Sequence, residues 1–228
     1  LTDLGIFYRQ RGNYAEAEKY WRRVAAMTPQ SIGAHANLGG LYTDMGRWEE
    51  ADRELKLALA IDPRSRPVLN NLGALALYRG RDTEAAHYFE RARDAGPETD
   101  VLMLNLGDAW RRTGKTTDAA AAYRRGRALS EQRLLNNPRD AVGRAFVAYF
   151  LARLGHRDLA RIELAQALSL DPQNKSVLRR AVLTYEALGE RGRALAALQG
   201  APADVVKELS RQPDLAQLRL DPRFAALI

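Results

Sequence analysis

Small and apolar residues recur along this chain with a period of 34 residues. The clearest marker is a leucine–glycine pair, which occurs at Leu4-Gly5, Leu38-Gly39, Leu72-Gly73 and Leu106-Gly107. Each pair is followed by a second glycine, an alanine and a large residue. These are Gly12, Ala17 and Trp21 in the first repeat, Gly46, Ala51 and Leu55 in the second, Gly80, Ala85 and Phe89 in the third, and Gly114, Ala119 and Tyr123 in the fourth. This pattern predicts one helix–turn–helix hairpin per repeat, which buries its apolar face only when neighbouring hairpins stack on it.

Each repeated position has a physical role in such a hairpin. The glycine in the middle of a repeat ends the first helix, because a residue without a Cβ atom adopts the left-handed conformation at little cost. The leucine–glycine pair and the alanine let two helices approach closely, and the large residue fills the remaining space. Prolines end the second helices of the first three repeats, at Pro29, Pro63 and Pro97. The residues therefore predict an all-α chain.

These positions resemble the tetratricopeptide repeat. The first repeat matches the family pattern at Leu4, Gly5, Tyr8, Gly12, Tyr14, Ala17, Trp21 and Pro29, and the second at Leu38, Gly39, Tyr42, Gly46, Trp48, Ala51, Ala58 and Pro63. The resemblance implies a right-handed superhelical solenoid of about six hairpins. It also implies an interaction scaffold that holds a protein or peptide partner in a concave groove and needs no cofactor.

The period changes after the fourth repeat. Gly155 follows Gly114 by 41 residues, so that seven additional residues fall between about positions 126 and 137. Residues 127–135 contain neither glycine nor proline, which predicts one long second helix in the fourth repeat. We therefore expect four repeats over residues 1–140, two degenerate repeats over 141–201 and a C-terminal helical cap over 202–228.

The predicted cap carries apolar residues between its prolines, at Leu215, Leu218, Leu220, Phe224, Leu227 and Ile228. A stack of repeats needs such an atypical element to cover its last apolar face. The segment from Pro213 onward is also similar to those that close repeat domains in multidomain bacterial signalling proteins. Together with the absence of an initiator methionine, this resemblance implies a C-terminal scaffold domain of a larger bacterial protein.

The family resemblance places a set of polar residues in the groove. The residue before each leucine–glycine pair faces the groove in this family, and three of the four are Asn37, Asn71 and Asn105. An asparagine amide both donates and accepts, so these side chains can pair with a peptide main chain, in an arrangement that resembles the asparagine ladder of the O-GlcNAc transferase repeat domain. The other expected groove residues are Asp44, Asn70, Tyr78, Asp108 and Arg112, with Phe146, Tyr149 and Arg180 in the degenerate half. Alternatively, the asparagines belong to the repeat consensus and the other side chains pack between repeats.

The carboxylate clamp of co-chaperone repeat domains grips a terminal carboxylate with lysine and arginine beside asparagines. At the corresponding positions the first three repeats offer Thr2, Ile6, Asn37, Pro67 and Asn71, so that only the asparagine at Asn37 matches and the basic residues are missing. We therefore expect no clamp of that kind.

Charge adds a second candidate surface. The net charge is +7, and residues 111–139 carry eight basic against two acidic side chains, a local excess of +6. The predicted basic patch lies on the long helix, at Arg124, Arg125, Arg127 and Arg133. It could attract nucleic acid or an acidic protein, but aromatic residues are not interleaved with it as single-strand binding requires. Nucleic-acid binding therefore stays an alternative, and self-association through the first hairpin or the long helix is another.

The sequence offers no catalytic constellation. A relaxed form of the phosphate-loop motif ends at Gly114, Lys115 and Thr116. That loop must follow a strand, whereas a helix is predicted before these residues. The three histidines are scattered, and there is no cysteine. We expect neither an enzyme nor a metal site. No apolar run reaches the length of a membrane helix. A chain without cysteine fits both the cytoplasm and the periplasm, and we favour the cytoplasm slightly.

Overall fold

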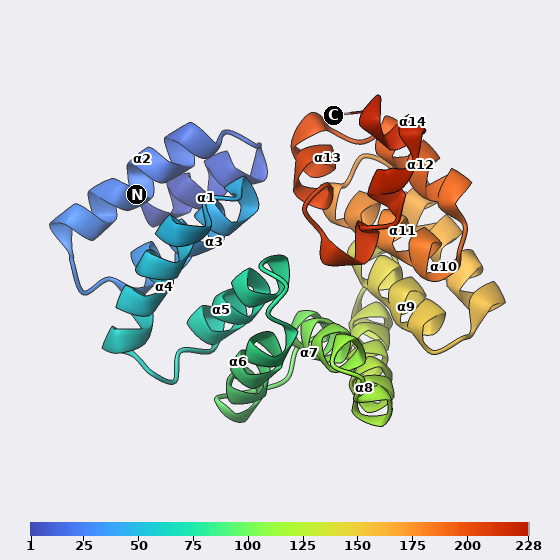
Figure 1. The fold of residues 1–228 in the computed structure, drawn as a ribbon, viewed down its shortest axis with the longest axis horizontal. Coiled ribbons are helices and arrows are strands. Elements are labelled where there is room, and N and C mark those ends of the chain that lie inside the picture. The colour runs from blue at the N-terminus through green and yellow to red at the C-terminus, as the bar shows by residue number, and fades with distance from the viewer. Residues whose placement is uncertain (228) are drawn as a thin grey trace. The chain divides into compact units, whose positions relative to one another are not determined.

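The computed structural model describes residues 1–227, which form helices joined by short turns and contain no strand (Figure 1). The first helices of the hairpins are α1 (Thr2–Gln10), α3 (Ile32–Met45), α5 (Arg66–Tyr78), α7 (Asp100–Arg112), α9 (Ala141–Arg153) and α11 (Lys175–Ala187). The second helices are α2 (Tyr14–Met27), α4 (Trp48–Ile61), α6 (Asp82–Asp94), α8 (Thr116–Asn136), α10 (Arg157–Leu170) and α12 (Arg191–Gln199). The predicted all-α solenoid of six hairpins is confirmed.

The chain divides into two compact units, one of residues 1–97 and one that begins at Glu98. The N-terminal unit contains the hairpins from α1 to α6, and the C-terminal unit contains those from α7 to α12 together with the tail. This boundary follows the third hairpin. The boundary predicted at residue 140 followed the change of period instead, and that division stays a prediction.

Every hairpin turns at a glycine with a positive φ angle. The six residues are Gly12, Gly46, Gly80, Gly114, Gly155 and Gly189, and their φ angles lie between 70° and 84°. No other residue type adopts a positive φ within residues 1–227. The mid-repeat glycines therefore do what the sequence predicts, because a side chain at these positions would be strained.

The leucine–glycine pair is explained by the large residue that follows it in the same repeat. In α3, a Cβ atom added to Gly39 would lie 2.4 Å from the Cγ atom of Leu55 in α4. Corresponding overlaps join Gly5 with Trp21, Gly73 with Phe89 and Gly107 with Tyr123. The glycine thus lets the two helices of a hairpin approach until the large side chain lies against bare backbone.

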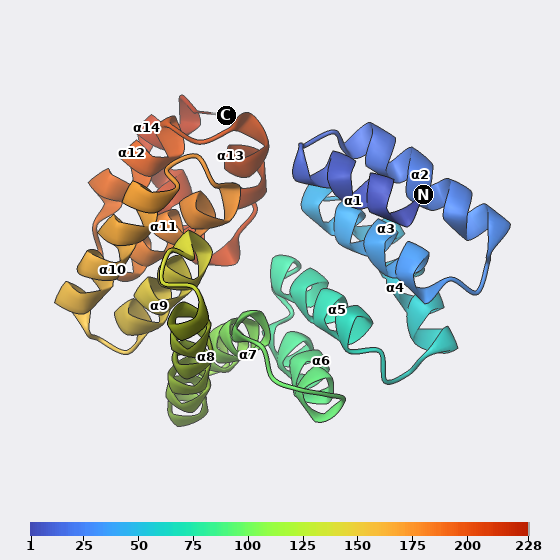
Figure 2. The same ribbon diagram turned by 180° about the vertical axis from the view of Figure 1, so that it is seen from behind.

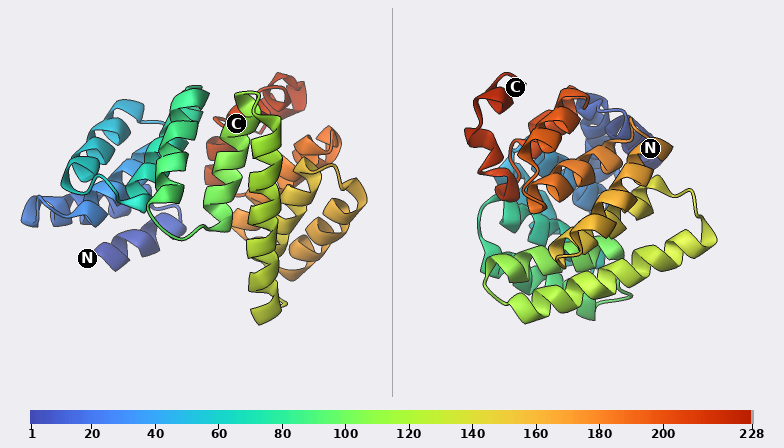
Figure 3. Two further views of the ribbon diagram at one scale, coloured as in Figure 1. Left: turned by 90° about the horizontal axis from the view of Figure 1, so that it is seen from below. Right: turned by 90° about the vertical axis from the view of Figure 1, so that its right-hand side faces the viewer.

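The long second helix of the fourth repeat is confirmed. Helix α8 has 21 residues, whereas α2, α4 and α6 have 13 or 14, and it extends past the end of α7 (Figure 3). Its added length is held to the chain on either side of it. The buried Ser130 hydroxyl donates to Asp100 across 3.2 Å, and the Arg133 guanidinium reaches both Asp100 and Asp140.

After α12 the chain forms α13 (Ala203–Leu209), two single turns, η1 (Pro213–Leu215) and η2 (Leu218–Leu220), and α14 (Pro222–Ala225), which are visible from both sides of the molecule (Figures 1 and 2). Helix α13 is tied to α11 by the ion pairs of Lys175 with Asp204 and of Arg179 with Glu208. The tail residues Leu209, Leu215, Leu218 and Phe224 are buried in one cluster with α11 and α12. Leu220 remains exposed, and Ile228 lies outside the described residues.

Two substitutions in α3 test the role of the paired glycine. We expect Gly39→Ala to lower the free energy of unfolding by about 1–2 kcal/mol, because overpacking against Leu55 outweighs the gain in helix propensity. Gly33 has no atom within 4 Å of the place where a Cβ would stand. Gly33→Ala should therefore leave the stability unchanged or raise it by up to about 1 kcal/mol. Urea unfolding of the two variants compares them, and equal effects would contradict this account.

Candidate functional site

Polar side chains join the first helices of the N-terminal unit to one another. The Arg9 guanidinium in α1 donates to the Asp44 carboxylate in α3, with N···O distances of 2.9 and 2.6 Å. The Asn71 amide in α5 donates to the carbonyl oxygen of Ala36 across 3.1 Å. Gly40 lies between these groups, since a Cβ atom placed there would be 3.4 Å from the Asn71 amide nitrogen. These polar contacts join α1 to α3 and α3 to α5.

The predicted groove residues of this unit lie on these first helices but differ in what they contact. Asn37 is half-buried, and its amide makes no hydrogen bond to any residue in the described part of the chain. Asn71 uses one N–H on Ala36. Asn70 is also half-buried, whereas the Tyr78 ring stacks on Trp48, with 5.8 Å between ring centroids. The structure thus brings Asn37 and Asn71 onto one set of helices, while Asn105 belongs to α7 in the other unit.

In the C-terminal unit, Asp108 lies at the centre of a network that links α7, α8 and α9. Its carboxylate accepts hydrogen bonds from the hydroxyl groups of Tyr123 and Tyr149, each with a shortest O···O distance of 2.7 Å. The Arg153 guanidinium donates to the Tyr149 hydroxyl across 2.9 Å. Burial raises the pKa of Asp108, although Arg153 acts in the opposite direction. The Asp108 carboxylate is thus engaged inside the protein.

Three arginines of the same unit converge on one carboxylate from the tail. The Asp214 oxygens accept from Arg111 at 2.6 and 2.7 Å, from Arg112 at 2.9 Å and from Arg153 at 2.6 Å. Burial acts to raise the pKa of Asp214, but Arg153 and Arg111 bring it below its ordinary value. The predicted groove residue Arg112 is therefore occupied by the chain itself. Sequence reasoning missed this cluster because Asp214 lies 103 residues from Arg111 and no motif connects them.

A cavity of about 260 Å³ adjoins this cluster. Its walls are formed by Arg111, Arg153, Leu183, Glu186, Ala187, Arg191, Asp214 and Gln217. Two buried atoms in the wall, Nε of Arg111 and Oε1 of Glu186, have no hydrogen-bond partner among the described residues. Burial raises the pKa of Glu186. The cavity is thus polar, with a donor and an acceptor that the described protein atoms leave unsatisfied.

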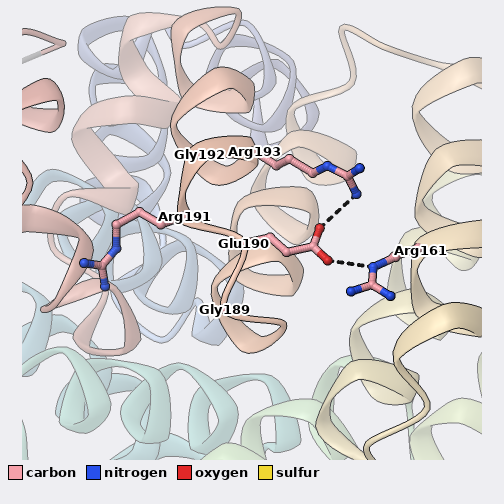
Figure 4. A pocket seen from close by; sticks show the side chains of 6 residues that line it. All are labelled: Arg161, Gly189, Glu190, Arg191, Gly192 and Arg193. Carbon is pink, nitrogen blue, oxygen red and sulfur yellow. Dashed lines mark hydrogen bonds and ion pairs between the residues drawn. The ribbon is translucent and has the colours of Figure 1, made fainter.

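A second, open depression lies at the turn between α11 and α12 (Figure 4). The Glu190 carboxylate is shared by Arg161 of α10 and Arg193 of α12, at 2.6 and 2.9 Å. Arg191 points to the other side of the turn (Figure 4), where it approaches Glu186 at 3.8 Å. These paired charges connect α10 with α12.

Three of the four arginines in the predicted basic patch form ion pairs. Arg125 pairs with Glu98 at 2.5 Å, and Arg133 pairs with Asp100 and Asp140. Arg127 pairs with Glu131 on the same helix. Elsewhere in residues 111–139, Arg111 and Arg112 share the Asp214 carboxylate with Arg153. Arg124 is exposed and has no ion pair within residues 1–227.

Within residues 1–227, no group of three or more histidine, aspartate or glutamate side chains is arranged to hold a metal ion. His35 is buried, with Nδ1 at 2.6 Å from Glu54 and Nε2 at 3.0 Å from the carbonyl oxygen of Pro29, so that it joins α3 to α4. None of the helices in the described part of the chain combines the length and the apolarity that crossing a membrane requires.

The stacked helical hairpins define a helical repeat protein. Two models of the tetratricopeptide repeat match residues 8–75 and 70–133, which together span more than half of the chain. The chain belongs to the tetratricopeptide repeat family and is a protein-interaction scaffold. No curated protein matches it significantly.

Solved structures share the fold. PilF of Pseudomonas aeruginosa is 25% identical, with a TM-score of 0.57 over 87% of each chain. PilW, a type IV pilus biogenesis factor, is 20% identical, with a TM-score of 0.58 over 99% of this chain and 96% of that one. A tetratricopeptide repeat protein of Parabacteroides merdae is 17% identical, with a TM-score of 0.60 over 99% and 82%. The last two show similarity of fold alone.

Replacing the carboxylate that the three arginines share should destabilise the C-terminal unit. We expect Asp214→Asn to lower the free energy of unfolding by about 2–3 kcal/mol. This loss is smaller than that from breaking a fully buried ion pair, because the amide oxygen of asparagine still accepts hydrogen bonds. The folded-state pKa of Asp214 lies below its unfolded value, so its contribution is complete above that unfolded value and is lost as the pH falls. The difference between wild type and variant should therefore shrink below about pH 4.

Thermal and urea unfolding between pH 3 and 7, roughly the range over which aspartates titrate, measure this difference. The matched control is Asp158→Asn, which removes an ion pair whose carboxylate is 92% exposed. We expect that control to change the stability by less than about 0.5 kcal/mol. A pH-independent effect of Asp214→Asn would show that its charge is not what holds the tail.

Proposed function

We propose that this chain binds an extended segment of a partner protein along the first helices of its hairpins, in the concave groove that the sequence predicts. The observation that carries the proposal is the Asn37 side chain. Its amide is half-buried on α3, yet it has no hydrogen-bond partner in the described part of the chain. The Asn37 amide is not among the buried side-chain atoms without a partner, so it is open to solvent and can pair with the main chain of a ligand.

Asn71 supports the same interpretation from the neighbouring first helix. Only one of its amide N–H groups is used, on the carbonyl oxygen of Ala36. Its second N–H and its carbonyl oxygen can pair with the C=O and N–H groups of a peptide main chain. Because the bond to Ala36 also fixes the orientation of the Asn71 amide, the binding group is positioned before a ligand arrives. Main-chain pairing of this kind places few demands on the ligand's side chains.

Removing both asparagine amides should weaken binding without unfolding the protein. The full chain is used to select ligands from a display library of random twelve-residue peptides, and the affinity of each enriched peptide is measured by fluorescence anisotropy. We expect the double variant Asn37→Ala/Asn71→Ala to weaken binding at least about tenfold, which corresponds to about 1.4 kcal/mol for the lost hydrogen bonds.

The matched control is Gln30→Ala, which removes an exposed amide from the loop between α2 and α3. It should change the affinity by less than about twofold, as expected of a surface substitution. If peptides are enriched but bind the double variant unchanged, these asparagines are not the site. If no peptide is enriched, the proposal of peptide binding is wrong.

Self-association is a second candidate because α1 leaves apolar side chains exposed. Leu4, Ile6 and Phe7 have 44%, 40% and 43% of their surface accessible in the described structure. A second copy of the chain could cover this face. Sedimentation velocity over a wide range of concentrations decides between the candidates, since a chain that remains monomeric at high concentration does not associate through α1.

A further inference from the structure

Arg180 is held in an unusual position on the first helices of the C-terminal unit. It belongs to α11, and its guanidinium carbon lies 5.0 Å from the centroid of the Phe146 ring and 5.8 Å from that of Tyr149, both in α9. The side chain is half-buried. It makes no hydrogen bond and no ion pair with any residue between 1 and 227. Its charge is therefore packed against aromatic rings, and no carboxylate is in direct contact with it.

The neighbouring arginines of the first helices are all matched with carboxylates. Arg111, Arg112 and Arg153 share Asp214, and Arg179, which precedes Arg180 in the chain, pairs with Glu208 at 2.5 Å. The tail therefore supplies a carboxylate to each of these groups. Arg180 is the exception among the arginines of α7, α9 and α11 in the described structure.

Leaving a guanidinium in this position costs free energy. Burial lowers the pKa of Arg180, and the nearby Tyr149 and Asp108 oppose that effect only in part. Cation–π contact with Phe146 and Tyr149 offsets some of the cost, but an apolar side chain of similar length would pack against the same rings without any desolvated charge. A charge kept at a cost to stability is typical of binding sites rather than of structural cores.

The geometry of Arg180 suits a carboxylate. A guanidinium that lies over an aromatic ring can still offer N–H groups that form paired hydrogen bonds with a carboxylate. The same surface already binds one, since Asp214 accepts from Arg153, whose guanidinium lies 5.0 Å from the Tyr149 ring that Arg180 also contacts. Leu215 and Leu218 are fully buried, so that the segment around Asp214 is anchored at its own site.

We infer that Arg180, stacked on Phe146 and Tyr149, anchors an aspartate or glutamate side chain of a protein partner that binds along the first helices of the C-terminal unit. The inference rests on the proposed scaffold function, but it does not depend on Asn37 and Asn71, which lie in the N-terminal unit. It names the chemistry of the partner: an acidic segment.

The first test separates a binding role from a structural one. Arg180→Met keeps the length of the side chain and its contact with the rings but removes the charge, so we expect an unchanged or higher Tm. Arg179→Met is the matched control on the same helix, and it should lower the Tm because it leaves the Glu208 carboxylate without its guanidinium. If Arg180→Met lowers the Tm as much as Arg179→Met does, Arg180 serves the fold and the inference is wrong.

The second test uses the same display library of random twelve-residue peptides with the full chain. We expect some selected peptides to bind Arg180→Gln at least about tenfold more weakly than the wild type, a loss of about 1.4 kcal/mol. Those peptides should be enriched in aspartate or glutamate. The matched control is Arg124→Gln, which removes an exposed, unpaired charge from α8 of the same unit, and it should leave their affinity within about twofold. Replacing the acidic residue of such a peptide by its amide should reproduce the loss.

The outcomes of the selection separate the two proposals. Peptides that depend on the asparagines but not on Arg180 would leave the scaffold function in place and overturn the acidic anchor. Peptides that bind Arg180→Gln and the wild type equally, or that depend on Arg180 without any acidic residue, would also overturn it. Dependence on Arg180 together with an acidic position, in peptides unaffected by Asn37→Ala/Asn71→Ala, would support the anchor and place binding on the C-terminal unit.

Discussion

The close approach of two helices at a bare glycine backbone is the contact on which every regular hairpin of this protein depends. In α3, Gly39 leaves space that the Leu55 side chain fills, and the same relation holds for Gly73 and Phe89. A Cβ atom on the glycine would need the volume that the large side chain already fills. Neither position can therefore change without a change at the other. The first and second helices are thereby held close together, so that successive hairpins within each unit can stack.

The tail shows a different way of closing such a stack. Its apolar residues enter the core beside α11 and α12, while Asp204, Glu208 and Asp214 reach basic residues on the first helices. Each carboxylate meets a guanidinium or an ammonium group that would otherwise face water or a partner. Many basic side chains of the C-terminal unit are in this way held in ion pairs, while residues 98–228 as a whole carry 21 basic against 15 acidic side chains, a net charge of +6.

Against this background of paired charges, the unpaired groups stand out. Asn37 and Arg180 lie on first helices of different units, and both are half-buried polar side chains whose hydrogen-bonding groups have no partner in the described structure. No atom of either side chain is both buried and without a hydrogen-bond partner, so both can reach a ligand. Their presence on the surface that stacked hairpins expose is what supports a scaffold that binds other protein segments.

The sequence by itself determined the hairpins, their turns and the long α8, because these depend on local propensity and on a period that repeats four times. It also placed Asn37 and Asn71 on first helices. Only the tertiary structure decided which polar side chains are paired within the protein. Arg112, for example, pairs with Asp214, which lies 102 residues away and is not connected to it by any motif in the sequence. The net charge of a segment can be counted from its sequence, but its ion pairs depend on which helices pack together. In the C-terminal unit, the buried tail brings the carboxylates to their basic partners.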